Sequence, residues 1–116
     1  TMTKKQAVEI YATIKDFRSG AMSKEGLTEY ILLRLKLKKV FDEFELARQE
    51  ISEQTRQDDT DEWNKAFTPI MEKWLSEEIE PLETAVLSQS DFIEMVTKND
   101  ILGIIVDTLY PILVKQ

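Results

Sequence analysis

A run of acidic residues near the middle of the chain is the first candidate for chemistry, because clustered carboxylates can bind Ca²⁺. The run comprises Asp58, Asp59, Asp61 and Glu62. A calcium loop also requires a glycine for its turn and a distal glutamate at a fixed interval, and the run has neither. Asp59 and Glu62 have the spacing of a capping box, so we interpret the run as the start of a helix and predict no metal site.

A second set of carboxylates raises the question of acid–base catalysis. Such chemistry requires two carboxylates that converge in a cleft, and the spacing of this set does not make its members converge. The chain contains no histidine and no cysteine, so it lacks the commonest general base, the commonest metal ligand and any thiolate. We therefore predict that the protein is not an enzyme and has no catalytic residue, no cofactor and no small-molecule substrate. The set consists of Glu72, Glu77, Glu78, Glu80 and Glu83.

Charge is distributed unevenly along the chain. Residues 1–41 carry nine basic and four acidic side chains, whereas residues 42–116 carry six basic and eighteen acidic ones. The basic cluster at residues 34–39 has two interpretations, a nucleic-acid patch or the solvated edge of an amphipathic helix that pairs with Asp42 and Glu43. The net charge of −7 favours the solvated edge, and we predict no nucleic-acid binding. The acidic half also suggests an alternative function, an inhibitor that mimics nucleic acid and blocks a basic protein groove.

The elements that must position these residues are predicted to be helices, because the chain has only three glycines and three prolines. We predict a mainly α fold in one domain over residues 1–116. Thr3 and Gln6 have the spacing of a capping box, which predicts a first helix from there to about Gly20. Short helices are expected near the C-terminus. The last of them is predicted to be capped by Asn99 or Asp100 and to end at Pro111.

The second helix has the clearest pattern, which we call the seam. Its apolar residues recur at intervals of three and four, and at ~1.5 Å per residue its thirty or so residues would extend about 45 Å. Ser23 or Thr28 is the expected N-cap. Ile31, Leu32, Leu35 and Phe41 add an apolar flank, so the first half of the helix should be buried on two sides and the second half on one. The seam consists of Leu27, Tyr30, Leu33, Leu37, Val40, Phe44, Ala47 and Ile51.

A third helix is expected to fold back on the second. The predicted architecture is a long antiparallel helical hairpin of residues 28–57 and 60–79, with the other helices packed on its apolar half. Pro69 either kinks the third helix or restarts it. Trp63, Phe67 and Trp74 form a stripe at helical spacing, which is more typical of a core than of a ligand-stacking site. A short extended pair near residues 78–87 is compatible with the Pro81 break.

A hairpin stem longer than its own core leaves residues 44–51 of the seam available to another chain. We therefore expect a non-enzymatic interaction or structural protein that binds a protein partner or itself, for example as a homodimer. Asp107 is the one charged residue in the last apolar stretch, and either faces water or lies in a subunit interface. The candidate interface residues are Leu37, Val40, Phe44, Ala47, Ile51, Ile105 and Leu109.

No membrane association is predicted from the apolar segments. The most apolar stretch, residues 101–114, is shorter than the ~20 residues that a spanning helix needs and contains Asp107 and Pro111. No segment has the features of a signal peptide, and we expect a cytoplasmic protein.

The order of features over about residues 31–113 supports one family-level comparison. A Leu/Lys-rich helix at residues 31–39 runs into residues 44–50, and an acidic turn and a further helix follow. Residues 78–82, the segment at 87–92 and a final Leu-rich helix ending near Pro111 complete the order. This pattern resembles that of a family of small phage-encoded helical proteins of unknown function. The resemblance implies a phage or prophage accessory protein and transfers no active-site residue.

Overall fold

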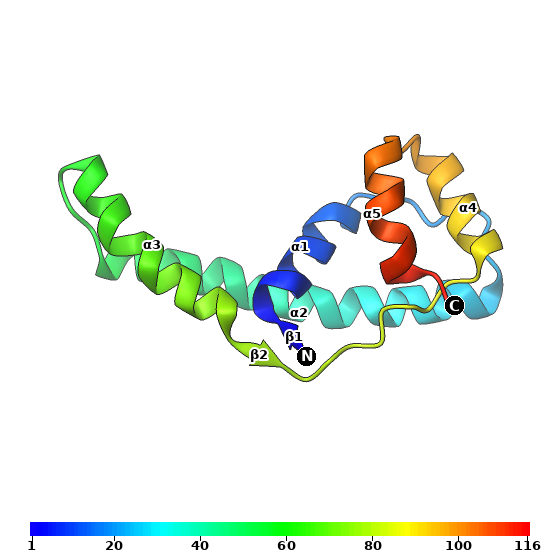
Figure 1. Ribbon diagram of the computed structural model, residues 1–116, viewed down its shortest axis with the longest axis horizontal. Coiled ribbons are helices and arrows are strands. Elements are labelled where there is room, and N and C mark those ends of the chain that lie inside the picture. The colour runs from blue at the N-terminus through cyan, green and yellow to red at the C-terminus, as the bar shows by residue number, and fades with distance from the viewer. The chain divides into compact units, whose positions relative to one another are not determined.

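The computed structural model describes all residues from 1 to 116 and is mainly helical, which confirms the predicted fold class. Two compact units are built from four segments, Thr1–Ala12 with Leu37–Pro81 and Thr13–Lys36 with Leu82–Gln116. The single domain expected from the sequence therefore stays a prediction. The elements in chain order are β1 (Met2–Thr3), α1 (Lys4–Ile14), α2 (Lys24–Gln54), α3 (Thr60–Ser76), β2 (Glu78–Ile79), α4 (Gln89–Asn99) and α5 (Gly103–Leu113) (Figure 1).

Helix α1 begins with the predicted capping box. The Gln6 N–H donates to Thr3 Oγ1 at 3.2 Å, and the Thr3 N–H donates to Gln6 Oε1 at 2.8 Å. The helix ends at Ile14 rather than near Gly20, so its predicted end is wrong. The reason is a distant side chain, because Arg34 donates to the Ile14 carbonyl at 2.8 Å and to the next carbonyl at 2.9 Å. These bonds satisfy carbonyl groups that a longer helix would otherwise have to pair.

The first unit contains the predicted antiparallel hairpin, formed by α3 and the part of α2 that begins at Leu37. Near the turn, Trp63 Nε1 donates to the Ser52 carbonyl at 3.1 Å, and near the other end the rings of Phe44 and Trp74 lie 6.2 Å apart. Asp59 caps α3 as predicted, accepting the Glu62 N–H at 3.0 Å. Helix α3 ends at Ser76 and not at residue 79.

Pro69 lies inside α3 without ending it, so the interpretation of a continuous helix is confirmed. Proline removes one backbone donor and pushes on the carbonyl one turn earlier, which is Lys65. Both Pro69 and Lys65 are exposed, so the carbonyl that loses its partner is on a side of the helix that faces solvent.

The extended segment predicted near residue 78 exists, but its partner differs from the expected one. Strand β2 pairs antiparallel with β1, with Ile79 opposite Met2 and Glu78 opposite Thr3. Leu87, in the segment expected to pair with residue 78, instead forms an isolated parallel bridge with Val114. Each pairing joins residues more than twenty positions apart, and such long-range partners leave no local signal in the sequence.

In the second unit, α4 begins at Ser88, whose hydroxyl accepts the Asp91 N–H at 3.1 Å. The predicted caps of the last helix are wrong. Asp100 has a left-handed backbone with φ of 50° and ends α4, while Asn99 accepts the Arg18 N–H at 2.7 Å. Helix α5 begins after Leu102 without a side-chain cap.

The predicted end of α5 at Pro111 is also wrong, because the helix continues to Leu113. Pro111 lies in the last turns, where it forfeits only the bond to the carbonyl of Asp107. Asp107 is exposed in the single chain, so that part of the helix is open to solvent or to a second subunit.

A buried carboxylate joins α4 to the start of α2. Asp91 is only 6% exposed and accepts the Ser23 N–H at 2.8 Å and the Ser23 hydroxyl at 2.7 Å. Ser23 in turn accepts the Gly26 N–H at 3.1 Å, which confirms it as the N-cap of α2. A Cβ on Gly26 would lie 2.0 Å from Asp91 Oδ2, so only glycine admits the carboxylate here.

These contacts also set the charge state of Asp91. The backbone N–H of Ser23 is the largest influence that holds the pKa of the Asp91 carboxyl below its usual range, and the hydroxyls of Ser23 and Ser88 act in the same direction. Burial opposes them. A carboxylate at a helix N-terminus is further favoured by the helix dipole.

Each unit has its own apolar core. In the first unit the core residues include Ala7, Val8, Tyr11, Leu37, Ile51 and Met71. In the second unit they include Ile14, Tyr30, Leu33, Leu87, Phe92, Met95, Leu109, Leu113 and Val114. Two aromatic contacts have a similar separation, Tyr11 with Phe41 at 5.1 Å in the first unit and Phe92 with Tyr110 at 5.5 Å in the second.

Candidate interaction surface

The structure places the seven candidate interface residues at different depths. Leu37 is 0% exposed, Ile51 8% and Leu109 1%, so these three side chains belong to the cores and are not available to another chain in this conformation. The remaining four are half-buried: Val40, Phe44, Ala47 and Ile105. The seam is therefore largely the inner face of α2.

The larger exposed apolar surface lies on the other side of α2. We call Ile31, Leu32 and Leu35 the outer flank; they are 46%, 47% and 59% exposed. The expectation that the first half of α2 is buried on two sides is therefore wrong. Figure 1 shows α4 and α5 on one side of the first turns of α2, and within this unit no further helix covers the opposite side.

Helical geometry makes the outer flank contiguous. Residues three and four apart are neighbours on a helix surface, so Leu35 contacts the same strip of surface as both Ile31, four residues earlier, and Leu32, three residues earlier. Thr28 continues this face by one more turn toward the N-terminus and is exposed. The surface is therefore a narrow aliphatic stripe with a small residue at one end.

Charged side chains border the stripe asymmetrically. Glu25 and Glu29 lie along one edge of the stripe toward its N-terminal end, and Lys36 lies along the same edge toward its C-terminal end. Lys24 continues the face of the stripe one turn before Thr28, and all four are exposed. None of them forms an ion pair within the chain, in contrast with Lys38, whose ammonium lies 2.8 Å from Asp42. That internal pair holds the pKa of Lys38 above its usual value. Lys38 and Asp42 therefore confirm one of the predicted i,i+4 pairs, whereas the predicted pair to Glu43 is not formed.

Other exposed aliphatic side chains are present but more widely spaced. On α2 and α3 these are Leu46 at 58% and Ile70 at 46%. On α4 this is Ile93 at 55%, and at the start of α5 they are Leu102 at 69% and Ile104 at 75%. Single exposed aliphatic residues are ordinary on protein surfaces.

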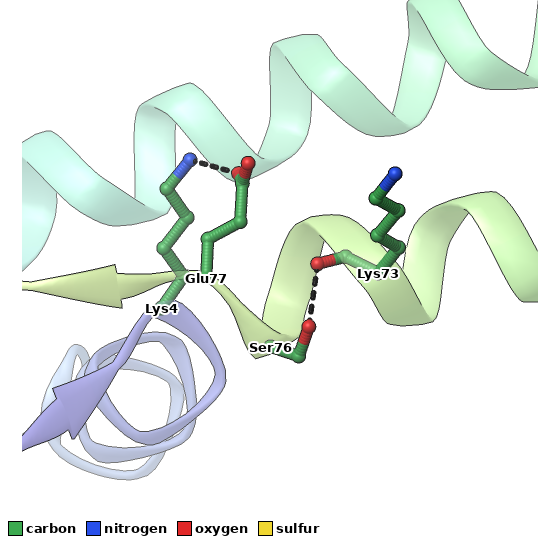
Figure 2. A network of polar contacts seen from close by, with 4 residues as sticks. All are labelled: Lys4, Lys73, Ser76 and Glu77. Atoms are coloured by element: carbon green, nitrogen blue, oxygen red, sulfur yellow. Dashed lines mark hydrogen bonds and ion pairs between the residues drawn. The ribbon is translucent and has the colours of Figure 1, made fainter.

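The polar contacts around Glu77 form a tie between the N-terminus and the end of α3. Figure 2 shows Lys4 reaching Glu77, with Nζ 2.7 Å from Oε1, and the Ser76 hydroxyl donating to the Lys73 carbonyl at 2.7 Å. The same ammonium lies 4.2 Å from the centroid of the Trp74 ring, and the Lys4 N–H donates to the Glu77 carbonyl at 3.0 Å. These contacts fix β1 against β2, which is a structural role.

The acidic residues considered for chemistry are dispersed. All of them are exposed, from the run at residues 58–62 to the set between Glu72 and Glu83. No group of three or more His, Cys, Asp or Glu side chains is arranged to hold a metal ion. Two of them have structural roles, because Asp59 caps α3 and Glu77 forms an ion pair with Lys4.

Two shallow hollows occur in the first unit. One, of about 250 Å³, is lined by Ser52, Trp63, Asn64 and Phe67. Its indole N–H is already used by the Ser52 carbonyl, and Trp63 and Phe67 are half-buried. The other, of about 400 Å³, is lined by Thr3, Lys5, Glu72, Leu75 and Ser76. Neither hollow holds a buried polar group that would orient a ligand.

Among the helices, none is long and apolar enough to cross a membrane. Comparison of the chain with protein-family models, curated proteins and solved structures finds no match. The outer flank is the feature that remains for a functional interpretation, and the sequence had assigned its residues to the core.

Proposed function

We propose that this chain is a non-enzymatic helical interaction protein, which binds another protein through the outer flank of α2. The observation that carries the proposal is the exposure of Ile31, Leu32 and Leu35, each about half accessible on adjacent positions of one helix face. Following the resemblance described above, the proposal includes an accessory role in a phage or prophage. It also includes the cytoplasmic location that the sequence analysis predicts.

The chemistry of the flank suits a protein partner. Aliphatic side chains offer no hydrogen bond to a polar ligand, and their favourable interaction is the removal of apolar area from water, at about 25 cal/mol per Å². Helix-in-groove recognition uses anchors at this spacing. Because the residues are held on a continuous helix, little conformational entropy is lost when they are covered.

The test compares three versions of the full chain as bait in a binding experiment with extract of the source cell. The flank variant carries Ile31→Ser, Leu32→Ser and Leu35→Ser. The matched control carries Leu46→Ser, which removes an equally exposed leucine from the same helix. Any protein retained by wild type and control but lost with the flank variant is purified, and its Kd is measured by calorimetry.

The expected result is at least one purified partner, this chain included, whose Kd rises by a factor of about ten or more in the flank variant only. Unchanged binding of all partners by the flank variant would refute the proposal. A complex with a basic protein that dissociates at moderate salt, and that ignores the flank variant, would favour the acidic nucleic-acid mimic instead.

A further inference from the structure

Along one edge of the outer flank, acidic residues lie toward the N-terminal end and a basic residue lies toward the C-terminal end. Glu29 lies three residues before Leu32, and Lys36 lies four residues after it. Glu25 adds a second carboxylate one turn beyond Glu29. All three charged groups are exposed and without an ion pair in the chain. A partner that covers the stripe would therefore need a basic group at one end and an acidic group at the other.

We propose that this partner is the outer flank of a second copy of the chain, packed antiparallel about a two-fold axis beside Leu32. The inference rests on the proposed function, since it names the occupant of the same surface. A two-fold interface uses the same patch on both subunits and requires it to be self-complementary. The acidic and basic ends of the flank meet that requirement.

The antiparallel direction follows from the charges. With the axis beside Leu32, Glu29 of each copy lies next to Lys36 of the other, which gives two symmetric ion pairs. In a parallel pair the glutamates would face each other and so would the lysines. Like charges at these positions are destabilising, so the same residues that favour one direction disfavour the other.

Side-chain size is also complementary in this arrangement. Thr28 lies four residues before Leu32 and Leu35 three residues after it, so the axis brings Leu35 of one copy against Thr28 of the other. A small residue opposite a large one lets two helices approach closely. Leu32 and Ile31 then fill the centre. The stripe is short, so the dimer is weak and depends on concentration.

The first experiment measures the mass of the full chain by sedimentation over a concentration series. Wild type is expected to pass from monomer to dimer. Lys36→Glu should raise the dissociation constant several-fold, because it places like charges together twice. The double variant Glu29→Lys with Lys36→Glu should restore most of the affinity, since the two symmetric pairs are rebuilt with the charges exchanged.

The second experiment fixes the geometry and uses the absence of native cysteine. Leu32→Cys lies beside the axis and should form a disulfide with its own copy under mild oxidation. Thr28→Cys should not, because two such residues would lie about 12 Å apart along the helices at ~1.5 Å per residue, beyond the ~7 Å limit for bridged Cα atoms. A mixture of Thr28→Cys and Leu35→Cys should give the mixed dimer, because these two positions face each other across the axis. Leu46→Cys measures random collision.

Each outcome decides between the proposals. A monomer at every concentration, with a foreign partner still bound through the flank, overturns the second-copy inference and leaves the proposed function standing. A monomer with no flank-dependent partner overturns both. A dimer that persists in the flank variant, or a Thr28→Cys disulfide in place of the Leu32→Cys one, also overturns the antiparallel arrangement.

Discussion

Leu32 and Leu33 are adjacent leucines on α2, yet Leu33 is 3% exposed and Leu32 is 47% exposed. The inner face of the helix, on the side of Leu33, is covered by other parts of the chain. The outer flank, on the side of Leu32, is not. The comparison teaches that apolar character at helical spacing defines a face that favours burial, whereas the cover is provided by other elements. An apolar face that the chain leaves exposed can be buried by a binding partner instead.

The largest test of this comparison is a pair of alanine substitutions at the adjacent leucines. Leu33→Ala should lower the free energy of unfolding by about 2–5 kcal/mol, because it leaves a cavity in the second core. Leu32→Ala should change it by less than about 0.5 kcal/mol in a sample dilute enough to be monomeric. Urea denaturation followed by circular dichroism measures both. Equal losses at the two positions would contradict the assignment of inner and outer faces.

The packing of α4 against the start of α2 depends on the buried carboxylate of Asp91, so the stability of the fold should depend on pH. The folded-state pKa of Asp91 is lowered, so its contribution to stability is complete above the unfolded pKa of about 4 and is lost as the pH falls through the folded pKa. Asp91→Asn should cost about 1.5–3 kcal/mol at pH 7, the range for hydrogen bonds to a charged group.

The difference between wild type and Asp91→Asn should begin to shrink below about pH 4, where the unfolded chain binds a proton that the folded carboxylate does not, and it should stop changing below the folded pKa, where the folded carboxyl is neutral as well. Urea titrations at a series of pH values measure it. A control variant, Asp107→Asn, removes an exposed carboxylate from the same unit and should change the free energy of unfolding at pH 7 by less than about 0.5 kcal/mol. A constant difference down to the lowest pH would contradict the prediction.

Gly26 tests how closely α4 approaches the start of α2. Gly26→Ala should lower the free energy of unfolding by about 1–3 kcal/mol, because the added methyl would meet Asp91 Oδ2 at 2.0 Å. Gly103→Ala is the control, since a Cβ there meets nothing within 4 Å. In the Asp91→Ala background the cost of Gly26→Ala should fall, and alanine's higher helix propensity should offset part of it. Additive costs would show that the two residues are not in contact.

These tests also mark what the sequence could predict. Caps made by nearby residues were predictable, as at Thr3 and Asp59, because both partners lie within one turn. The caps formed by distant residues were not. Arg34 ends α1 from twenty residues away, and Asp91 joins the cap of α2 from sixty-eight residues away. Only the folded chain brings these groups together.

The sequence predicted an apolar interaction surface on α2 but assigned it to the inner side of the helix. The sequence identified α2 as the element with excess apolar surface, and it named Ile31, Leu32 and Leu35 as an apolar flank. It could not decide which of the two apolar sides of α2 would be covered, since helical periodicity is the same for a buried and an exposed face. In the structure the seam around Leu37 is buried in the core, whereas the outer flank is exposed.

Tyr30 offers a smaller test on the inner face. Its ring is 1% exposed, and its hydroxyl is buried without a hydrogen-bond partner in the chain. Burial raises the pKa of this hydroxyl, and the nearby Arg34 opposes the rise. Tyr30→Phe should leave the protein as stable as wild type or more stable by about 1 kcal/mol, because an unpaired polar group is removed from the core. A loss of more than about 1 kcal/mol would show that the hydroxyl is paired.

The smallest expected effect belongs to the outer flank. The triple variant Ile31→Ser, Leu32→Ser and Leu35→Ser should change the stability of the monomer only slightly, since exposed positions contribute little packing and serine costs a few tenths of a kcal/mol each in helix propensity. Thermal unfolding at low protein concentration measures this. At high concentration the wild type should become more stable while the variant does not, because binding of a partner to the native state adds stability by mass action. A variant that unfolds at low concentration would mean that the flank is part of the chain's own core, and the contrast between Leu32 and Leu33 would be lost.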